Sequence, residues 1–252
     1  MRRLLGCLLV ALTLASCQKP AAETHPIASE TSAAVPLLPT EAEAAVTVDD
    51  VPIERDLTAF VVRRRVQDRA PMIFIPGMCV HPRDYMLTFR HAAAERGDLI
   101  AIQGDVSCGG DGYGRRWSND LVAMNRRIDA AFAAAHLPPP RDTVIMGYSQ
   151  GAERAERLVA LFPRKYRAAV LIASPIAPSP DRLRGLRAVA LMAGSLDRQP
   201  AMQAAVAPLR CAGVAAQFFV IPGARHGQMG DEPERTMGAA LDFVNAPTGP
   251  AP

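Results

Sequence analysis

The stretch Thr143-Val144-Ile145-Met146-Gly147-Tyr148-Ser149-Gln150-Gly151 decides the fold of this chain. An apolar run rich in β-branched residues leads into Gly-Tyr-Ser-Gln-Gly, and a helical pattern begins at Ala152. A serine between two glycines at a strand-to-helix turn presents its hydroxyl above the edge of a sheet. Side chains at Gly147 or Gly151 would crowd the tight turn that holds such a serine in a strained conformation. The motif therefore predicts that Ser149 is a catalytic nucleophile; the alternative is an ordinary glycine-rich turn between a strand and a helix.

Apolar and amphipathic segments alternate along the chain on both sides of this motif. We expect an antiparallel strand at 59–62 and further strands at 72–75, 99–102, 143–148, 168–172, 188–192 and 215–221. We expect helices at 83–95, from a Ser118 cap through 135, and at 150–161, 200–211 and 233–244. This alternation predicts an α/β fold, a mostly parallel sheet with helices on both faces. Functional residues should therefore directly follow the strands.

Two polar residues follow later strands in the order that a serine nucleophile requires. The strand ending at Met192 leads to Asp197, and the last strand leads to His226. A nucleophilic serine needs a histidine to accept its proton, and the histidine needs a carboxylate to fix its tautomer and stabilise its charged form. The separations of 48 (197 − 149) and 29 (226 − 197) residues leave room for helix–strand units between them. The three side chains can therefore meet at one edge of the sheet.

Each of these assignments has an alternative. Asp197 could cap the helix that begins near Pro200, and Asp181 is a weaker candidate acid because 178–180 suggests an excursion rather than a strand end. His226 could be an ordinary loop histidine. His81 is its rival, but it does not follow a strand in the right order, so substrate contact is its better role. Three further histidines lie in a polar N-terminal segment or in helical patterns: His25, His91 and His136.

Acyl transfer also needs donors for the oxyanion that forms. The first should be the backbone N–H of Gln150, directly after the nucleophile. The second should come from the turn Pro76-Gly77-Met78 after the strand at 72–75, and we predict the N–H of Met78, with Cys79 as the alternative.

From about Pro71 to Asn245 the chain resembles the α/β-hydrolase superfamily. Within it, the runs 147–151 and 225–227 look like those of the phospholipase/carboxylesterase and dienelactone-hydrolase-like group, which includes acyl-protein thioesterases. The resemblance implies Ser149, Asp197 and His226 in this order, cleavage of carboxylic esters or thioesters, and no cofactor. The group's usual His-Gly in the oxyanion loop is Pro76-Gly77 here. Gly-Tyr-Ser-Gln-Gly also occurs in cutinases, but their Asp–His gap is much shorter and carries a cysteine pair that this chain lacks.

Cys79 and Cys108 follow two strands that should be neighbours in this fold. We therefore predict a disulfide between them, closing a span of 29 residues (108 − 79), with two reduced buried cysteines as the alternative. The glycine-rich stretch 109–114 lacks the Gly-Lys-Ser/Thr ending of a phosphate loop. It should instead form a rim, where Tyr113 and Trp117 either line a substrate pocket or pack the loop. The cysteine spacings do not suit zinc, so we expect no metal.

The N-terminus predicts export. Residues 1–16 combine a basic start with a short apolar run, and Leu14-Ala15-Ser16-Cys17 resembles the lipobox of bacterial lipoproteins. The resemblance implies lipid attachment to Cys17 and, because Gln18 is not aspartate, an outer-membrane location facing the periplasm or the exterior. Ordinary secretion is the alternative. Residues 17–45 read as a disordered tether, 46–246 as the hydrolase domain and 247–252 as a disordered tail.

Charge and composition argue against a nucleic-acid partner. Losing Arg2 and Arg3 with the signal peptide lowers the formal net charge from +3 to +1 (3 − 2), and no basic-aromatic motif is present. The sequence thus predicts a lipid-anchored serine esterase or thioesterase acting on a small or medium acyl group. A serine peptidase on the same fold and a non-catalytic binding lipoprotein are the alternatives.

Overall fold

The computed structural model describes residues 45–66, 69–110 and 113–246. These residues belong to one unit, Glu41–Pro252. The expected signal peptide, Cys17 and almost all of the tether, as well as the tail at 247–252, lie outside the described residues. Among the helices that are described, none has both the length and the apolar character needed to cross a membrane.

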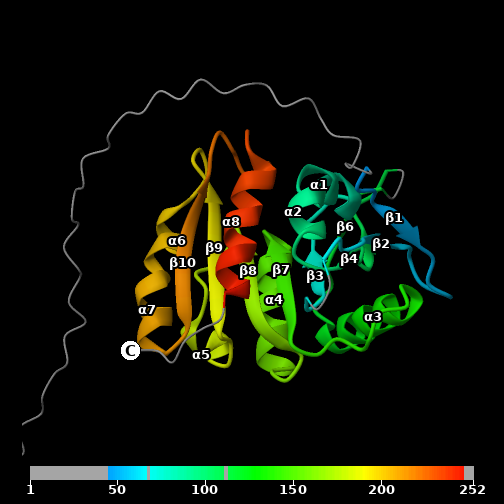
Figure 1. Ribbon diagram of the computed structural model, residues 1–252, viewed down its shortest axis with the longest axis horizontal. Coiled ribbons are helices and arrows are strands. Elements are labelled where there is room, and N and C mark those ends of the chain that lie inside the picture. The colour runs from blue at the N-terminus through cyan, green and yellow to red at the C-terminus, as the bar shows by residue number, and fades with distance from the viewer. Residues whose placement is uncertain (1–44, 67–68, 111–112, 247–252) are drawn as a thin grey trace, which may run out of the picture. The chain divides into compact units, whose positions relative to one another are not determined.

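An eight-stranded sheet forms the centre of this unit, in the order β1-β2-β4-β3-β7-β8-β9-β10 (Figure 1). The six strands from β4 to β10 in this order run parallel, whereas β2 is antiparallel to both β1 and β4. Both the α/β architecture and the antiparallel strand at 59–62 are therefore confirmed. The bounds are β1 Asp49–Val51, β2 Ala59–Val62, β3 Met72–Ile75, β4 Leu99–Ala101, β7 Thr143–Tyr148, β8 Tyr166–Ile172, β9 Ala188–Gly194 and β10 Ala215–Ile221.

Helices cover both faces of the sheet. One face packs against α1 Pro82–Thr88, α2 Arg90–Ala94 and α8 Pro233–Asn245. The other packs against α3 Leu121–Ala134, α4 Gln150–Leu161, α5 Pro180–Leu183, α6 Pro200–Ala204 and α7 Val206–Cys211. A separate two-stranded hairpin, β5 Val106–Ser107 with β6 Arg115–Arg116, lies between β4 and α3 in the chain.

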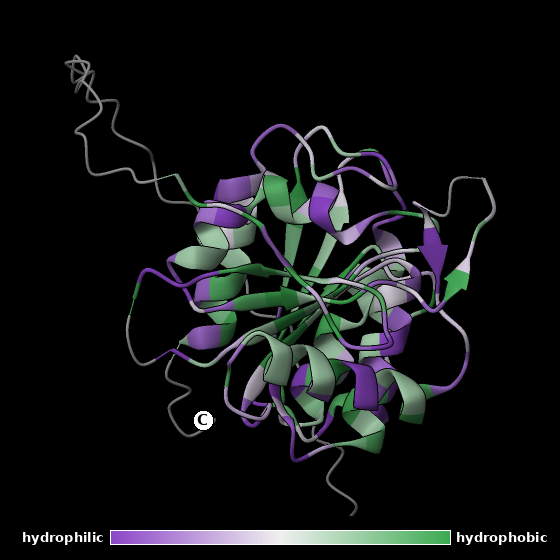
Figure 2. Ribbon diagram, turned by 90° about the vertical axis from the view of Figure 1, so that its right-hand side faces the viewer, coloured by the Kyte–Doolittle hydropathy of each residue, from purple (hydrophilic) through white to green (hydrophobic). Residues whose placement is uncertain are grey.

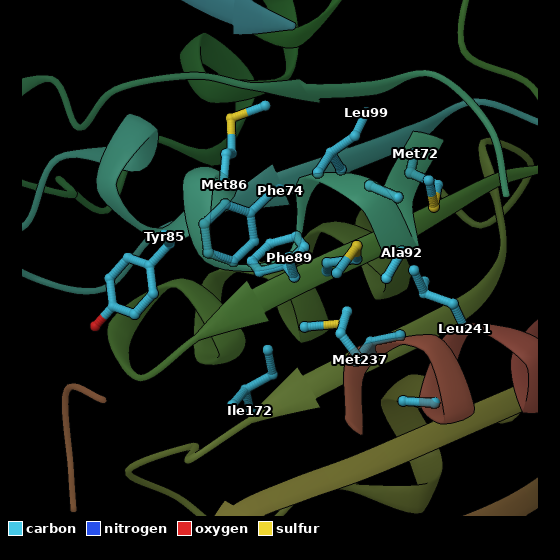
Figure 3. Close-up of a cluster of buried hydrophobic side chains, with 14 of the residues drawn as sticks. Met72, Phe74, Tyr85, Met86, Phe89, Ala92, Leu99, Ile172, Met237 and Leu241 are labelled. Carbon is cyan, nitrogen blue, oxygen red and sulfur yellow. The ribbon is translucent and has the colours of Figure 1, made fainter. Parts of the chain in front are cut away.

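Alternation along the buried strands builds two cores, one on each face. In β3, Met72 and Phe74 point to the α1, α2 and α8 side, whereas Ile73 and Ile75 point to the other. Figure 3 shows the first core, where Phe74 and Phe89 meet edge to face with ring centres 5.7 Å apart. Figure 2 shows the strands as hydrophobic at the centre, with hydrophilic residues on the outer sides of the helices. Burial on both faces explains the nearly continuous apolar runs of the parallel strands.

The helix expected at 83–95 is two helices, α1 and α2, which meet at Phe89. The Thr88 hydroxyl donates to the Tyr85 carbonyl at 2.7 Å, and the Phe89 N–H donates to Met86 instead. A side-chain hydroxyl has thus occupied the carbonyl that the next helical turn needs. The single helix was wrong, and the break lets the buried Phe89 ring reach Phe74.

The helix expected at 200–211 is also divided, into α6 and α7 around Ala205. Pro208 has no N–H, and its ring crowds the carbonyl of Ala204 four residues earlier, so a continuous helix is disfavoured there. The Ser118 cap was wrong as well. Asp120 caps α3 by accepting from the Ala123 N–H at 2.8 Å, while the Ser118 hydroxyl accepts from the Asp120 N–H.

Candidate active site

Ser149 stands at the turn between β7 and α4, in the strained conformation that the motif predicts. Its backbone angles are φ 50° and ψ −118°, in the left-handed region that non-glycine residues rarely adopt. A Cβ added to Gly147 would lie 2.4 Å from the Gly151 oxygen, and one added to Gly151 would lie 2.0 Å from the Ile75 oxygen. The two glycines therefore allow β7, α4 and the end of β3 to meet at the serine.

The ends of β9 and β10 bring Asp197 and His226 to Ser149. His226 Nε2 lies 2.9 Å from Ser149 Oγ, and His226 Nδ1 lies 2.9 Å from Asp197 Oδ2. The Asp197 side chain is 9% exposed, whereas that of His226 is 51% exposed. A carboxylate with little water around it interacts strongly with the imidazole, and the open face of the ring leaves room for a substrate.

The backbone around Asp197 leaves one carboxylate oxygen for the histidine. Asp197 Oδ1 accepts from the Arg198 N–H at 2.7 Å, so Oδ2 faces His226. Asp197 does not cap the following helix, because the N-cap of α6 is Gln199, with no side-chain cap bond. Asp181 instead forms an exposed ion pair with Arg184 in and beside α5.

The loop after β3 borders Ser149. A Cβ added to Gly77 would lie 3.4 Å from the Ser149 Cβ, so Gly77 lies close to Ser149. The Cys79 N–H donates to the Arg115 carbonyl at 2.8 Å, so it is already engaged. No acceptor is present for the Met78 or Gln150 N–H among the residues described. The Met78 and Gln150 amides are therefore free to donate, whereas the Cys79 amide is not.

Trp117 is buried beneath this loop rather than at its surface. Its indole N–H donates to the Pro76 carbonyl at 2.7 Å, and its backbone N–H donates to Gln150 Oε1 at 3.0 Å. Trp117 therefore packs inward against the loop after β3. By these bonds it connects the segment that carries Met78 to the residue that follows Ser149.

The predicted disulfide between Cys79 and Cys108 is confirmed, with their Cα atoms 5.6 Å apart. It joins the residue after Met78 to the residue after β5, and the Cys108 N–H donates to the Gly114 carbonyl. The β5–β6 hairpin and the loop after β3 therefore form one braced unit. Cys211 is exposed at the end of α7 and takes no part in this bridge.

His81 and Tyr113 line a cleft of about 830 Å³ that begins beside the candidate residues. Their rings stack with centres 4.3 Å apart, and the Tyr113 hydroxyl donates to Asp84 Oδ1 at 2.8 Å. Burial lowers the pKa of His81, although Asp84 opposes this effect, so His81 is favoured in its neutral form. The lining of the cleft also includes Cys79 and Gly227, the residue that follows His226.

A second hollow of about 450 Å³ lies beside His226. Its lining includes His226 and Asp197 together with Ala173, Ser174 and Pro175 from the segment after β8. His226 thus lines this hollow, and the next residue, Gly227, lines the cleft.

Two tyrosines at the site carry no role in the sequence-based prediction. Tyr85, in α1, and Tyr148, directly before Ser149, both bond to the backbone of Gly227. Sequence reasoning could have predicted that each hydroxyl is bonded, since a buried tyrosine hydroxyl usually has a hydrogen-bond partner. The identity of that partner depends on the tertiary structure.

No protein-family model matches the chain, and no curated protein matches it in sequence. Solved structures do match its fold. Esterase PE8 aligns over 73% of this chain and 97% of its own, with a TM-score of 0.56 and 19% identity. A predicted CIB-like hydrolase from Thermoplasma acidophilum aligns over 79% and 98%, with a TM-score of 0.58 and 16% identity. Carboxylesterase CesB from Bacillus subtilis aligns over 80% and 92%, with a TM-score of 0.57 and 13% identity. Together with the strand order and the turn at Ser149, these matches show that the chain has the α/β-hydrolase fold.

Proposed function

We propose that the protein is a serine hydrolase that cleaves a carboxylic ester or thioester of a small or medium acyl group. The observation that carries the proposal is the continuous line of contacts from Ser149 Oγ through both His226 nitrogens to Asp197 Oδ2, with both distances 2.9 Å. Esterases and other hydrolases among the matched structures support it by analogy of fold.

The proposed reaction proceeds through an acyl-enzyme. Ser149 Oγ attacks the carbonyl carbon as His226 Nε2 takes its proton, and Asp197 stabilises the imidazolium through Nδ1–H. The N–H groups of Gln150 and Met78 donate to the oxyanion. His226 then gives the proton to the departing alcohol or thiol, and a water molecule, activated by the same nitrogen, releases the acid from Ser149.

The cleft beside His226 suggests which leaving or acyl groups fit. It carries the carboxylates of Asp84 and Asp231, and its described lining residues include no lysine or arginine. An anionic group would be repelled there, whereas a neutral or cationic group would not. A choline ester, its uncharged 3,3-dimethylbutyl isostere and a succinate half-ester should therefore be hydrolysed with the anionic substrate slowest. A fastest rate for the anionic substrate would contradict this part of the proposal.

A fluorophosphonate probe tests the chemistry directly. We expect stoichiometric labelling of the wild type and none of Ser149→Ala. Absence of wild-type labelling would favour the non-catalytic binding protein. Hydrolysis of p-nitrophenyl esters of increasing chain length, compared with a peptide amide, should favour the short and medium esters; preference for the amide would favour a peptidase.

We also propose that the mature protein is anchored by lipid on Cys17 in the outer membrane. The support is the lipobox-like sequence Leu14-Ala15-Ser16-Cys17 followed by Gln18. Buried acyl methylenes contribute about 0.8 kcal/mol each to membrane binding. Metabolic labelling with a palmitate analogue should mark the wild type and not Cys17→Ser, and the variant should leave the membrane fraction. Equal labelling of both would refute the anchor.

A further inference from the structure

Tyr85 and Tyr148 hold the two backbone hydrogen-bonding groups of Gly227, the residue after His226. The Tyr85 hydroxyl donates to the Gly227 carbonyl at 3.0 Å, and the Gly227 N–H donates to the Tyr148 hydroxyl oxygen at 2.7 Å. The Tyr148 hydroxyl also lies 3.5 Å from the Gln228 carbonyl, which is too long for a strong bond. We propose that these tyrosines are positioning residues that set the placement of His226 between Ser149 and Asp197.

The loop that carries His226 has little packing of its own. Residues from Arg225 to Gln228 are exposed, and Gly227 has a φ of 89°. Local bonds connect the loop to itself, as between the Gln228 N–H and the Arg225 carbonyl. A histidine on such a segment needs an external anchor, because proton transfer requires placement within about 0.5 Å.

The tyrosines are suited to serve as that anchor because they are rigid. Tyr85 is 6% exposed and Tyr148 is 2% exposed, and their rings contact each other with centres 4.9 Å apart. The Tyr148 ring also meets the His226 ring edge to face at 5.8 Å. In the first core, shown in Figure 3, Tyr85 lies beside Phe74. The packed core is thus connected to Gly227, the residue after His226, through the hydroxyl groups of these two tyrosines.

The hydroxyl groups of Tyr85 and Tyr148 stay protonated at neutral pH. Burial raises the pKa of Tyr148 to about 12, and burial also raises that of Tyr85. Tyr85 therefore remains a donor to the Gly227 carbonyl at neutral pH. Because Tyr85 follows the loop that carries Met78 and Tyr148 precedes Ser149, Gly227 is tied to both of the other segments of the proposed site.

The test uses Tyr85→Phe and Tyr148→Phe, which remove a hydroxyl group and keep the ring. Tyr166→Phe is the matched control, because Tyr166 is 3% exposed and its hydroxyl has no partner among the described residues. Tyr85→Phe and Tyr148→Phe are called the clamp variants below. We expect kcat for a p-nitrophenyl ester to fall about tenfold in each clamp variant, with KM within twofold. Counting sites by the fluorophosphonate end point removes any misfolded fraction from kcat. Wild-type kcat in both clamp variants would overturn the proposal.

A second measurement does not depend on turnover. When His226 Nδ1–H is held on Asp197, its proton should give a low-field NMR resonance. We expect this resonance in the wild type and Tyr166→Phe, and its loss or broadening in both clamp variants. An unchanged resonance in both variants would overturn the proposal. The kinetic test depends on the proposed hydrolase function, whereas the resonance would report on the clamp even if no ester were cleaved.

Discussion

Replacing Gly151 with alanine should damage the protein and its proposed activity together. A Cβ at this position would lie 2.0 Å from the Ile75 oxygen and 2.4 Å from the Pro76 oxygen. Since Cβ atoms essentially never approach other heavy atoms within 3.0 Å, the start of α4 and the end of β3 must separate by about 1 Å (3.0 − 2.0). Both obstructing atoms belong to the backbone, so no side-chain rotation can relieve the contact.

The size of the effect follows from that displacement. Overpacking of this kind costs about 1–3 kcal/mol of stability, or roughly 2–12 °C in Tm for a domain of this size. The same movement separates Ser149 from the Met78 amide, and a misplacement of about 1 Å costs about 100-fold in rate. Tm is measured by thermal unfolding, and the rate by fluorophosphonate labelling at 20 °C, well below the transition.

Other glycines provide matched controls. Gly185→Ala should leave Tm and labelling unchanged, because a Cβ there meets no atom within 4 Å. Gly77→Ala should fold normally, because its nearest contact would be 3.4 Å. If Gly151→Ala kept both the Tm and the labelling rate of Gly185→Ala, the reasoning from close backbone approach at the turn would be refuted.

Three further changes have effects that the structure determines. Asp197→Asn should lower kcat by about four orders of magnitude, because histidine loses the partner that fixes its tautomer, while Asp181→Asn, outside the site, should retain wild-type kcat in the same ester assay. Replacing Cys79 and Cys108 together by serine should cost roughly 3–4 kcal/mol in chemical denaturation, as the loop-entropy estimate for 29 residues gives, and reduction of the denatured wild type should expose two additional thiols; an unchanged thiol count would contradict the bridge. Burial raises the pKa of Glu156 above its ordinary value of 4.5, so folding favours its protonated form and its contribution to stability declines as pH rises above 4.5; Glu156→Gln should weaken that decline in Tm, and an unchanged pH dependence would contradict it.

Much of the sheet could be predicted from sequence because its strands are buried on both faces. The expected strand at 143–148 and helix at 150–161 agree with β7 and α4. Short elements were missed: β1, with its sequence Asp-Asp-Val, carries no apolar run, and the two-residue strands β5 and β6 depend on pairing across the loop between them. The division of the helix at 200–211 could have been predicted, because Pro208 in the sequence disfavours a continuous helix.

Contacts between distant segments were predictable only where the fold itself sets them. The order of Asp197 and His226 after strands β9 and β10 brings them to one sheet edge whatever the intervening helices do. The same argument located the cysteine pair, since β3 and β4 are neighbours. The strand order could not indicate that Trp117 turns inward. Its backbone and indole N–H groups donate to Gln150 and Pro76, which lie 33 and 41 positions away in the sequence.

Contacts between distant segments stabilise the strained turn at Ser149. A serine at φ 50° is tolerated only when the surrounding structure determines its conformation strongly. That support comes from the glycines that bring β3 against α4, and the loop after β3 is in turn held by the disulfide and by Trp117. Ser149 and the proposed oxyanion donors are thereby held against the core, but His226 lies on an exposed loop. The two tyrosines would give that loop the same connection to the core. Ser149, His226 and Asp197 would then keep their relative positions as one rigid unit.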